Sequence, residues 1–150
     1  FDSGLDIRCI RSFDIDESCT EIADAVNNTH VQNNWQFKAI TQNMFDIDYN
    51  EHNWIAWSKT NNRMSYNIDV PDTIINTSCE HINNFSKWFD SIPTGTLTIL
   101  QSNDYFDIEE HVNCSKDLKH FDQITPMKDT IYLDELVLPL YTRFMKIGIK

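Results

Sequence analysis

The feature that most constrains this sequence is a short apolar run that ends abruptly in reactive side chains. Residues 73–75 are a threonine and two isoleucines, placed just after Pro71 and Asp72. The following residues are all polar or reactive: Asn76, Thr77, Ser78, Cys79, Glu80 and His81. A buried strand that ends in such a cluster is typical of an open α/β sheet, where ligands bind outside the carboxyl ends of the strands. We therefore predict that residues 76–81 form the floor of a binding site.

Strand patterns and helix patterns alternate along the rest of the chain. We expect strands at 6–13, 35–41, 73–76 and 96–101, helices at 17–26 and 82–92, a loop and helix through 121, and a loop plus short helix at 49–67. Two last strands, 130–138 and 141–149, are joined by Pro139 and Leu140. That link is too short for a crossover helix, so this pair should be antiparallel. The predicted fold is therefore α/β, with a doubly wound, mostly parallel sheet and an antiparallel C-terminal strand pair.

The composition of the chain favours a globular protein and disfavours nucleic acid and membranes as partners. A chain of 150 residues with 41% hydrophobic and 12% aromatic residues has enough apolar material for one globular domain, residues 1–150. The net charge of −11 repels phosphate backbones, so we expect no nucleic-acid partner. No apolar run approaches the ~20 residues that cross a bilayer, so we expect no membrane. Four cysteines are too few for a disulfide scaffold, and a reducing cytoplasm is the expected compartment.

Polar side chains also follow the first two predicted strands. Asp14 stands at the end of a strand and just before a helix, where a carboxylate is placed to accept hydrogen bonds from ribose hydroxyls. Asn43 follows the next strand and is suited to an adenine amino group, with Met44 lining the ring. The alternative is that Asp14 and Asp16 only cap the helix and that Asn43 and Met44 are ordinary loop residues.

Histidines beside carboxylates are the candidates for catalysis. Glu80–His81 follows the third predicted strand, and Glu110–His111 repeats the pair after the fourth. A histidine beside a carboxylate can act as a general base near neutral pH. Further polar groups for a substrate follow the fourth strand: Gln101, Asn103 and Tyr105. The alternative for each Glu–His pair is a surface turn at the start of a helix.

A metal site is a further alternative. Cys79, His81, His111 and Cys114 have the side chains that bind zinc. Their C-x-H and H-x-x-C spacings do not match the usual zinc motifs. We therefore predict no metal.

Taken together, these segments resemble class I, Rossmann-type S-adenosylmethionine-dependent methyltransferases. The resemblance covers nearly the whole chain and is carried by the order of five segments: 12–16, 37–44, 72–81, 95–103 and 141–148. It implies a Rossmann-like sheet, S-adenosylmethionine as cofactor and a small-molecule acceptor. It implies that Asp14, Asn43 and Met44 hold the nucleoside and that Asn76, Thr77 and Ser78 line the reactive end of the cofactor. Substrate binding would fall to Gln101, Asn103, Tyr105 and His111, with His81 as the base and Glu80 orienting it or binding substrate.

The chain departs from that family at its start. Members have a central first strand and a glycine-rich loop, whereas the glycines here, Gly4, Gly95 and Gly148, lie far apart. The resemblance therefore implies an N-terminally truncated fragment. Three alternatives stay open: an aminocarboxypropyl transferase similar to nicotianamine synthase, a nicotinamide-dependent oxidoreductase, and a binding or scaffold protein without activity.

Overall fold

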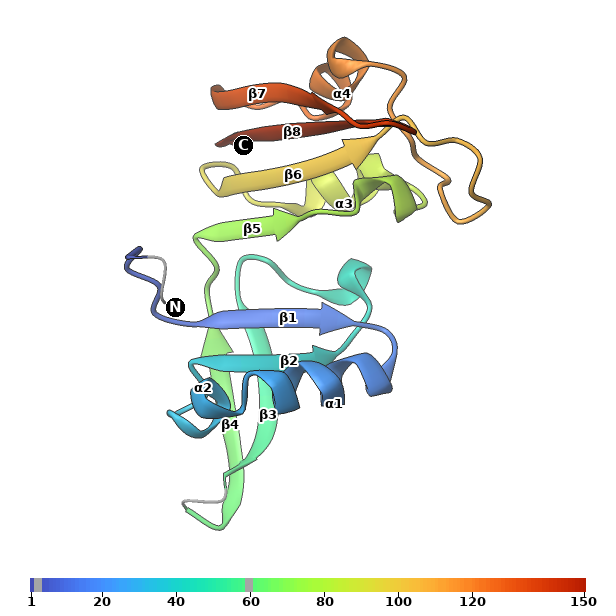
Figure 1. Ribbon diagram of the computed structural model, residues 1–150. Coiled ribbons are helices and arrows are strands. Elements are labelled where there is room, and N and C mark those ends of the chain that lie inside the picture. Colours follow the sequence, from blue (N-terminus) through green and yellow to red (C-terminus); the bar gives the residue numbers. More distant parts are fainter. Residues whose placement is uncertain (2–3, 59–60) are drawn as a thin grey trace. The chain divides into compact units, whose positions relative to one another are not determined.

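The computed structural model describes residues 1, 4–58 and 61–150. They divide into two compact units, Phe1–Ile47 and Asp48–Lys150 (Figure 1). Across these described residues, we find no helix with the length and apolar character needed to cross a bilayer.

The first unit is a strand–helix–strand arrangement. Its elements are β1 (Ile10–Asp14), α1 (Glu17–Val26), α2 (Asn28–Gln32), β2 (Phe37–Thr41) and the 3-10 turn η1 (Met44–Asp46). β1 and β2 are parallel, and α1 contacts both strands. The Asp16 carboxylate accepts a hydrogen bond from the Ser18 backbone N–H at 2.9 Å and so caps α1. The predicted helix over 17–26 is confirmed.

The second unit begins with a hairpin that the sequence pattern did not predict. β3 (His52–Ser58) and β4 (Arg63–Asp69) are antiparallel, so the expected loop and short helix at 49–67 is wrong. The reason lies in which residues point inward. His52, Trp54 and Ser58 are buried while Asn53 and Ile55 are exposed. Burial alternates along the chain, as it does in a strand. Polarity does not follow burial, because two of the three inward side chains are polar and Ile55, one of the outward ones, is hydrophobic.

The main sheet of the second unit has the strand order β5-β6-β8-β7. Its strands are β5 (Thr73–Asn76), β6 (Leu97–Asn103), β7 (Asp129–Val137) and β8 (Thr142–Ile149). β5 and β6 are parallel, whereas β8 runs antiparallel to both β6 and β7. The predicted antiparallel C-terminal pair is confirmed, and β5 has the predicted bounds.

The predicted doubly wound, mostly parallel Rossmann-like sheet is wrong. In the part of the chain that the structure describes, the strands form separate sheets: β1-β2, β3-β4 and β5-β6-β8-β7. Parallel strands need a long crossover connection, usually helical. The connection from β2 to β5 instead contains the antiparallel hairpin, and β8 inserts between β6 and β7. Only β5–β6 is therefore parallel in the largest sheet.

Two helices and one turn complete the second unit. They are the 3-10 turn η2 (Cys79–His81), α3 (Phe85–Ser91) and α4 (Leu118–Ile124). α4 packs on β7 and β8, with the ring of Phe121 6.2 Å from that of Phe144. Lys146 of β8 is buried beneath it, and its ammonium donates hydrogen bonds of 2.6 Å to the Asp122 carboxylate and the Thr125 carbonyl. These contacts hold α4 on the sheet.

Gly148 provides a test of the packing between β8 and its edge partner. A Cβ at this position would lie 2.4 Å from the Asp129 carbonyl oxygen and 2.7 Å from the Met127 sulfur. Because a backbone atom would have to move, we expect Gly148→Ala to lower the free energy of unfolding by about 1–3 kcal/mol. Urea unfolding followed by circular dichroism measures this change. Ile131→Ala, which removes an exposed side chain from β7, is the matched control and should cost less. Equal unfolding midpoints for Gly148→Ala and the wild type would contradict the packing described.

Candidate functional site

The carboxyl ends of β5 and β6 lie side by side because the two strands are parallel neighbours. The turn η2 follows β5 directly and contacts β6. From this turn Glu80 reaches the last residue of β6, and the Asn103 Nδ2 donates a hydrogen bond of 2.7 Å to Glu80 Oε1. Each residue is only 3% exposed. The sheet therefore holds a carboxylate in its interior, just beneath its open end.

Asn103 is itself fixed in the orientation that serves Glu80. Its Oδ1 accepts a hydrogen bond of 2.9 Å from the Tyr105 backbone N–H. The Cys114 thiol approaches the same oxygen at 3.5 Å. Because the oxygen faces these donors, the amide nitrogen is left to point at the carboxylate. The sequence predicted a substrate contact for Asn103, and the structure places it against Glu80 as a positioning residue.

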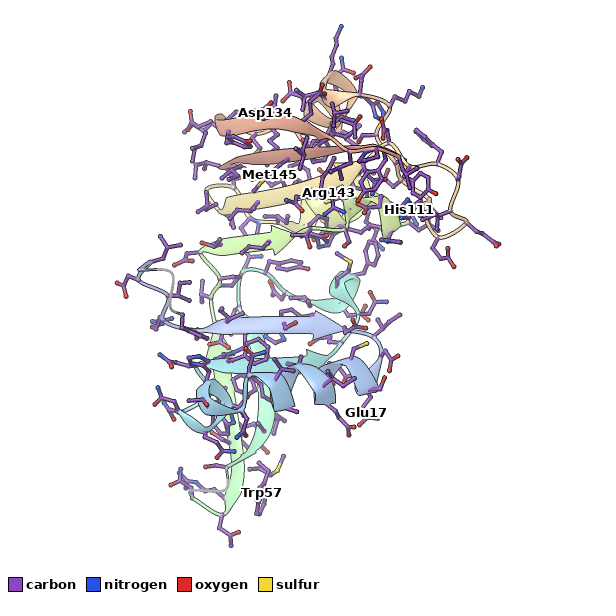
Figure 2. All side chains as sticks on the ribbon, in the orientation of Figure 1. Glu17, Trp57, His111, Asp134, Arg143 and Met145 are labelled. Carbon is purple, nitrogen blue, oxygen red and sulfur yellow. The ribbon has the colours of Figure 1, made fainter. Side chains whose placement is uncertain are left out.

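The segment after β6 folds back onto η2. The Asn113 backbone N–H donates to the Glu80 carbonyl at 2.8 Å, and Asn113 Nδ2 donates to the Cys79 carbonyl at 3.1 Å. The Ser115 backbone N–H donates to the Asn103 carbonyl at 2.9 Å. These bonds bring His111 beside His81, although 30 positions separate them in the sequence. Figure 2 shows His111 at the end of the sheet toward which β6 points.

The two imidazole rings meet edge to face, with centroids 4.6 Å apart and an interplanar angle of 82°. His81 Nδ1 lies 3.2 Å from the Glu110 carbonyl oxygen, and His111 Nδ1 lies 2.7 Å from the Tyr105 carbonyl oxygen. A carbonyl oxygen only accepts, so each Nδ1 carries the hydrogen. In the neutral rings, Nε2 then holds the lone pair.

We call Glu80, His81 and His111 the strand-end cluster. One ligand atom from each of these residues lies within 4.8 Å of the others. Glu80 Oε2 is buried and has no hydrogen-bond partner among the described residues. Glu80 is buried, His111 is half-buried and His81 is exposed, so the cluster opens to solvent at His81. A buried polar atom without a partner is uncommon and points to a ligand, a proton or an ion at this place.

The two nearby cysteines are neutral thiols. Cys79 is 1% exposed, and burial together with the Glu80 charge raises the pKa of its thiol. Burial and the same charge also raise the pKa of Cys114, whose sulfur lies 3.7 Å from His111 Nδ1. The sequence alternative grouped both cysteines with the histidines. The structure adds the Glu80 carboxylate to the two histidines, and the adjacent Glu80–His81 pair was the sequence signal for it.

Gln101 and Tyr105 lie beside residues that the sequence analysis did not select. Gln101 Oε1 accepts a hydrogen bond of 3.3 Å from Arg143 Nη1, and the Tyr105 ring stacks on Tyr141 with centroids 5.6 Å apart. The Arg143 guanidinium lies 5.9 Å from the centroid of the Tyr141 ring. Arg143, which Figure 2 labels, pairs with Asn103 in the register between β8 and β6. This proximity follows from sheet order, which no local motif shows.

The residues predicted to line the reactive end of a cofactor form a turn after β5. Asn76 Oδ1 accepts a hydrogen bond of 2.9 Å from the Ser78 backbone N–H. Thr77 and Ser78 are exposed. The Asn76 side chain therefore shapes the turn that leads from β5 into η2.

The predicted nucleoside contacts belong to the first unit. Asp14 ends β1 and is exposed, and its Oδ1 accepts a hydrogen bond of 2.9 Å from the Asp16 backbone N–H. Asn43 lies just beyond β2 and caps η1, with Oδ1 accepting from the Phe45 N–H at 3.0 Å. Met44 is half-buried. The parallel pairing of β1 and β2 brings Asp14 and the segment of Asn43 to the same end of this small sheet.

The burial of the site thiols predicts their reactivity. Cys19 is exposed, whereas Cys79 and Cys114 are buried. We expect iodoacetamide to modify Cys79 and Cys114 in the native protein at least about tenfold more slowly than Cys19, because a buried thiol must be exposed before its thiolate forms. Peptide mass spectrometry after timed labelling measures each site. All three sites should react alike in urea, and equal rates in the native protein would rule out the described packing around η2.

The strand-end cluster thus combines a buried carboxylate, two imidazoles of defined tautomer and an opening to solvent. Comparisons of the chain with models of protein families, with curated proteins and with solved structures found no match.

Proposed function

We propose that this protein is an S-adenosylmethionine-dependent methyltransferase that acts on a small-molecule acceptor. The observation that carries the proposal is the strand-end cluster, which lies at the carboxyl ends of a parallel strand pair and opens to solvent. This is where α/β proteins bind ligands. The proposal rests on these residues and their chemistry, not on the shape of the whole sheet.

Within the first unit, taken by itself, Asp14 and Asn43 offer groups that fit the nucleoside part of such a cofactor. One Asp14 oxygen accepts a backbone hydrogen bond, and the other has no partner among the described residues, so it is available to ribose hydroxyls. The Asn43 oxygen, which we expected to meet the adenine amino group, caps η1 instead, and this leaves the amide N–H groups for an acceptor nitrogen on the adenine ring. Both groups are exposed at the ends of neighbouring strands. They supply one anionic acceptor and one neutral donor.

The chemistry is a displacement at carbon. When bound, S-adenosylmethionine supplies an electrophilic methyl group, so that the acceptor lone pair forms the new bond while the carbon–sulfur pair stays on sulfur. The residues of this chain position the acceptor and take up its proton. His81 is suited to the proton because its Nδ1 faces the Glu110 carbonyl and its Nε2 holds a lone pair near the solvent. Glu80 stabilises the imidazolium that forms.

The surroundings support a polar, small acceptor. Tyr105 stacks on Tyr141, and the Arg143 guanidinium lies over the Tyr141 ring, so the three offer a cation and stacked aromatic faces at the same end of the sheet. The net charge of −11 disfavours an acceptor on nucleic acid. All four cysteines are free thiols, which supports a reducing compartment and our proposal of the cytoplasm.

The test is the binding of S-adenosylhomocysteine by titration calorimetry. We expect the wild-type chain to bind it and Asp14→Ala to bind about 10- to 100-fold more weakly, because hydrogen bonds to a charged group contribute about 1.5–3 kcal/mol. Asp6→Ala removes an exposed carboxylate ahead of the same strand and should bind as the wild type does. No binding by the folded wild type, or equal binding by Asp14→Ala, would contradict the proposal and favour a non-catalytic binding protein.

A further inference from the structure

We infer that the strand-end cluster is a binding site for one divalent transition-metal cation, held by the Glu80 carboxylate, His81 Nε2 and His111 Nε2. Two histidines and one carboxylate are a common ligand set for catalytic zinc and for non-haem iron. One ring nitrogen of each histidine and one Glu80 carboxylate oxygen already lie within 4.8 Å of one another.

Both histidines are prepared as metal ligands. Metal-binding histidines usually donate their second ring N–H to a carbonyl or carboxylate, which fixes the tautomer and the ring orientation. Here His81 Nδ1 faces the Glu110 carbonyl at 3.2 Å and His111 Nδ1 faces the Tyr105 carbonyl at 2.7 Å. Each Nε2 therefore carries the lone pair that a cation needs.

The unpaired oxygen of Glu80 supports a cation at this site independently of the histidines. Glu80 is 3% exposed, and its Oε2 has no hydrogen-bond partner among the described residues. Asn103 holds the other oxygen at 2.7 Å. A buried carboxylate with one unpaired oxygen is unfavourable, and a cation at Oε2 would offset that cost. Asn103 would act as the positioning residue that orients the ligand.

The ligand set also selects the class of metal. Imidazole nitrogens favour zinc, cobalt, nickel, iron or manganese over magnesium and calcium, which prefer oxygen ligands. Ligand bonds of about 2.0–2.2 Å would bring the ligand atoms to about 3–3.5 Å from one another. The ring of His81 can shift by this amount because it is exposed, whereas Glu80 is buried and His111 is half-buried. Three protein ligands leave a coordination position open toward solvent.

The role of this cation, though not its binding, rests on the proposed function. A metal at the open position would bind the acceptor oxygen and lower the pKa of its hydroxyl. With the cation bound, the Nε2 lone pair of His81 is used as a ligand and no longer takes up the proton, so the proton of the acceptor would leave to solvent. Metal binding can be measured without the cofactor, so a failure of either proposal is distinguishable from a failure of the other.

The experiment titrates the metal-free chain with Co²⁺ and with Zn²⁺, without S-adenosylmethionine, by calorimetry and visible absorption. We expect one cation per chain, with Co²⁺ bands of low-symmetry coordination and no cobalt–thiolate charge-transfer band. Glu80→Gln and His111→Ala should each weaken binding at least about tenfold, and Asn103→Ala about 10- to 100-fold. Glu110→Gln is the matched control, because it removes a neighbouring carboxylate and keeps the carbonyl that faces His81.

Thermal unfolding separates lost ligation from lost folding. Zn²⁺ should raise the melting temperature of the wild type and of Glu110→Gln, since a ligand that binds the folded state stabilises it. Glu80→Gln should unfold cooperatively, at or above the melting temperature of the metal-free wild type, because it removes a buried charge, and Zn²⁺ should not shift it. No binding by the folded wild type, or equal binding by the wild type, Glu80→Gln and His111→Ala, would overturn the inference.

Discussion

The hydrogen bond from Asn103 to Glu80 is the interaction on which the site depends. It joins the end of β6 to the turn that follows β5, and both partners are buried. A buried carboxylate is held at a defined place only if a donor meets it there. The other Glu80 oxygen is buried without a hydrogen-bond partner among the described residues, and one oxygen of this carboxylate lies within 4.8 Å of a ring nitrogen of each histidine. The cluster therefore depends on the contact between the end of β6 and the turn that follows β5.

The local sheet order explains why this arrangement is possible. β5 and β6 run parallel, so their carboxyl ends and the following segments meet at one edge. β8 then lies antiparallel to β6 and brings Arg143 opposite Asn103. The segment between β6 and α4 closes the edge through the backbone bonds of Asn113 and Ser115. The candidate site is thus built on a sheet in which β5 and β6 are the one parallel pair.

Local patterns in the sequence predicted the parts that depend on nearby residues. The strand Thr73–Asn76, the helix Glu17–Val26 and the antiparallel final pair follow from a short apolar run, a helix cap and a short link, respectively. The hairpin at β3–β4 was missed because polar His52 and Ser58 face inward. The partner of Glu80 was missed because it depends on the register between separate strands. Sheet order is a property of tertiary packing, and local propensity does not determine it.

The most direct test of this account is a crystal structure of the chain grown with Co²⁺, with anomalous diffraction recorded at the cobalt edge. We predict one strong anomalous peak at bonding distance from His81 Nε2, His111 Nε2 and a Glu80 carboxylate oxygen, with both Nδ1 atoms still facing their carbonyls. The account would be contradicted by crystals that show no peak at the strand-end cluster. Ligation through Cys79 or Cys114 in place of Glu80 would contradict it equally.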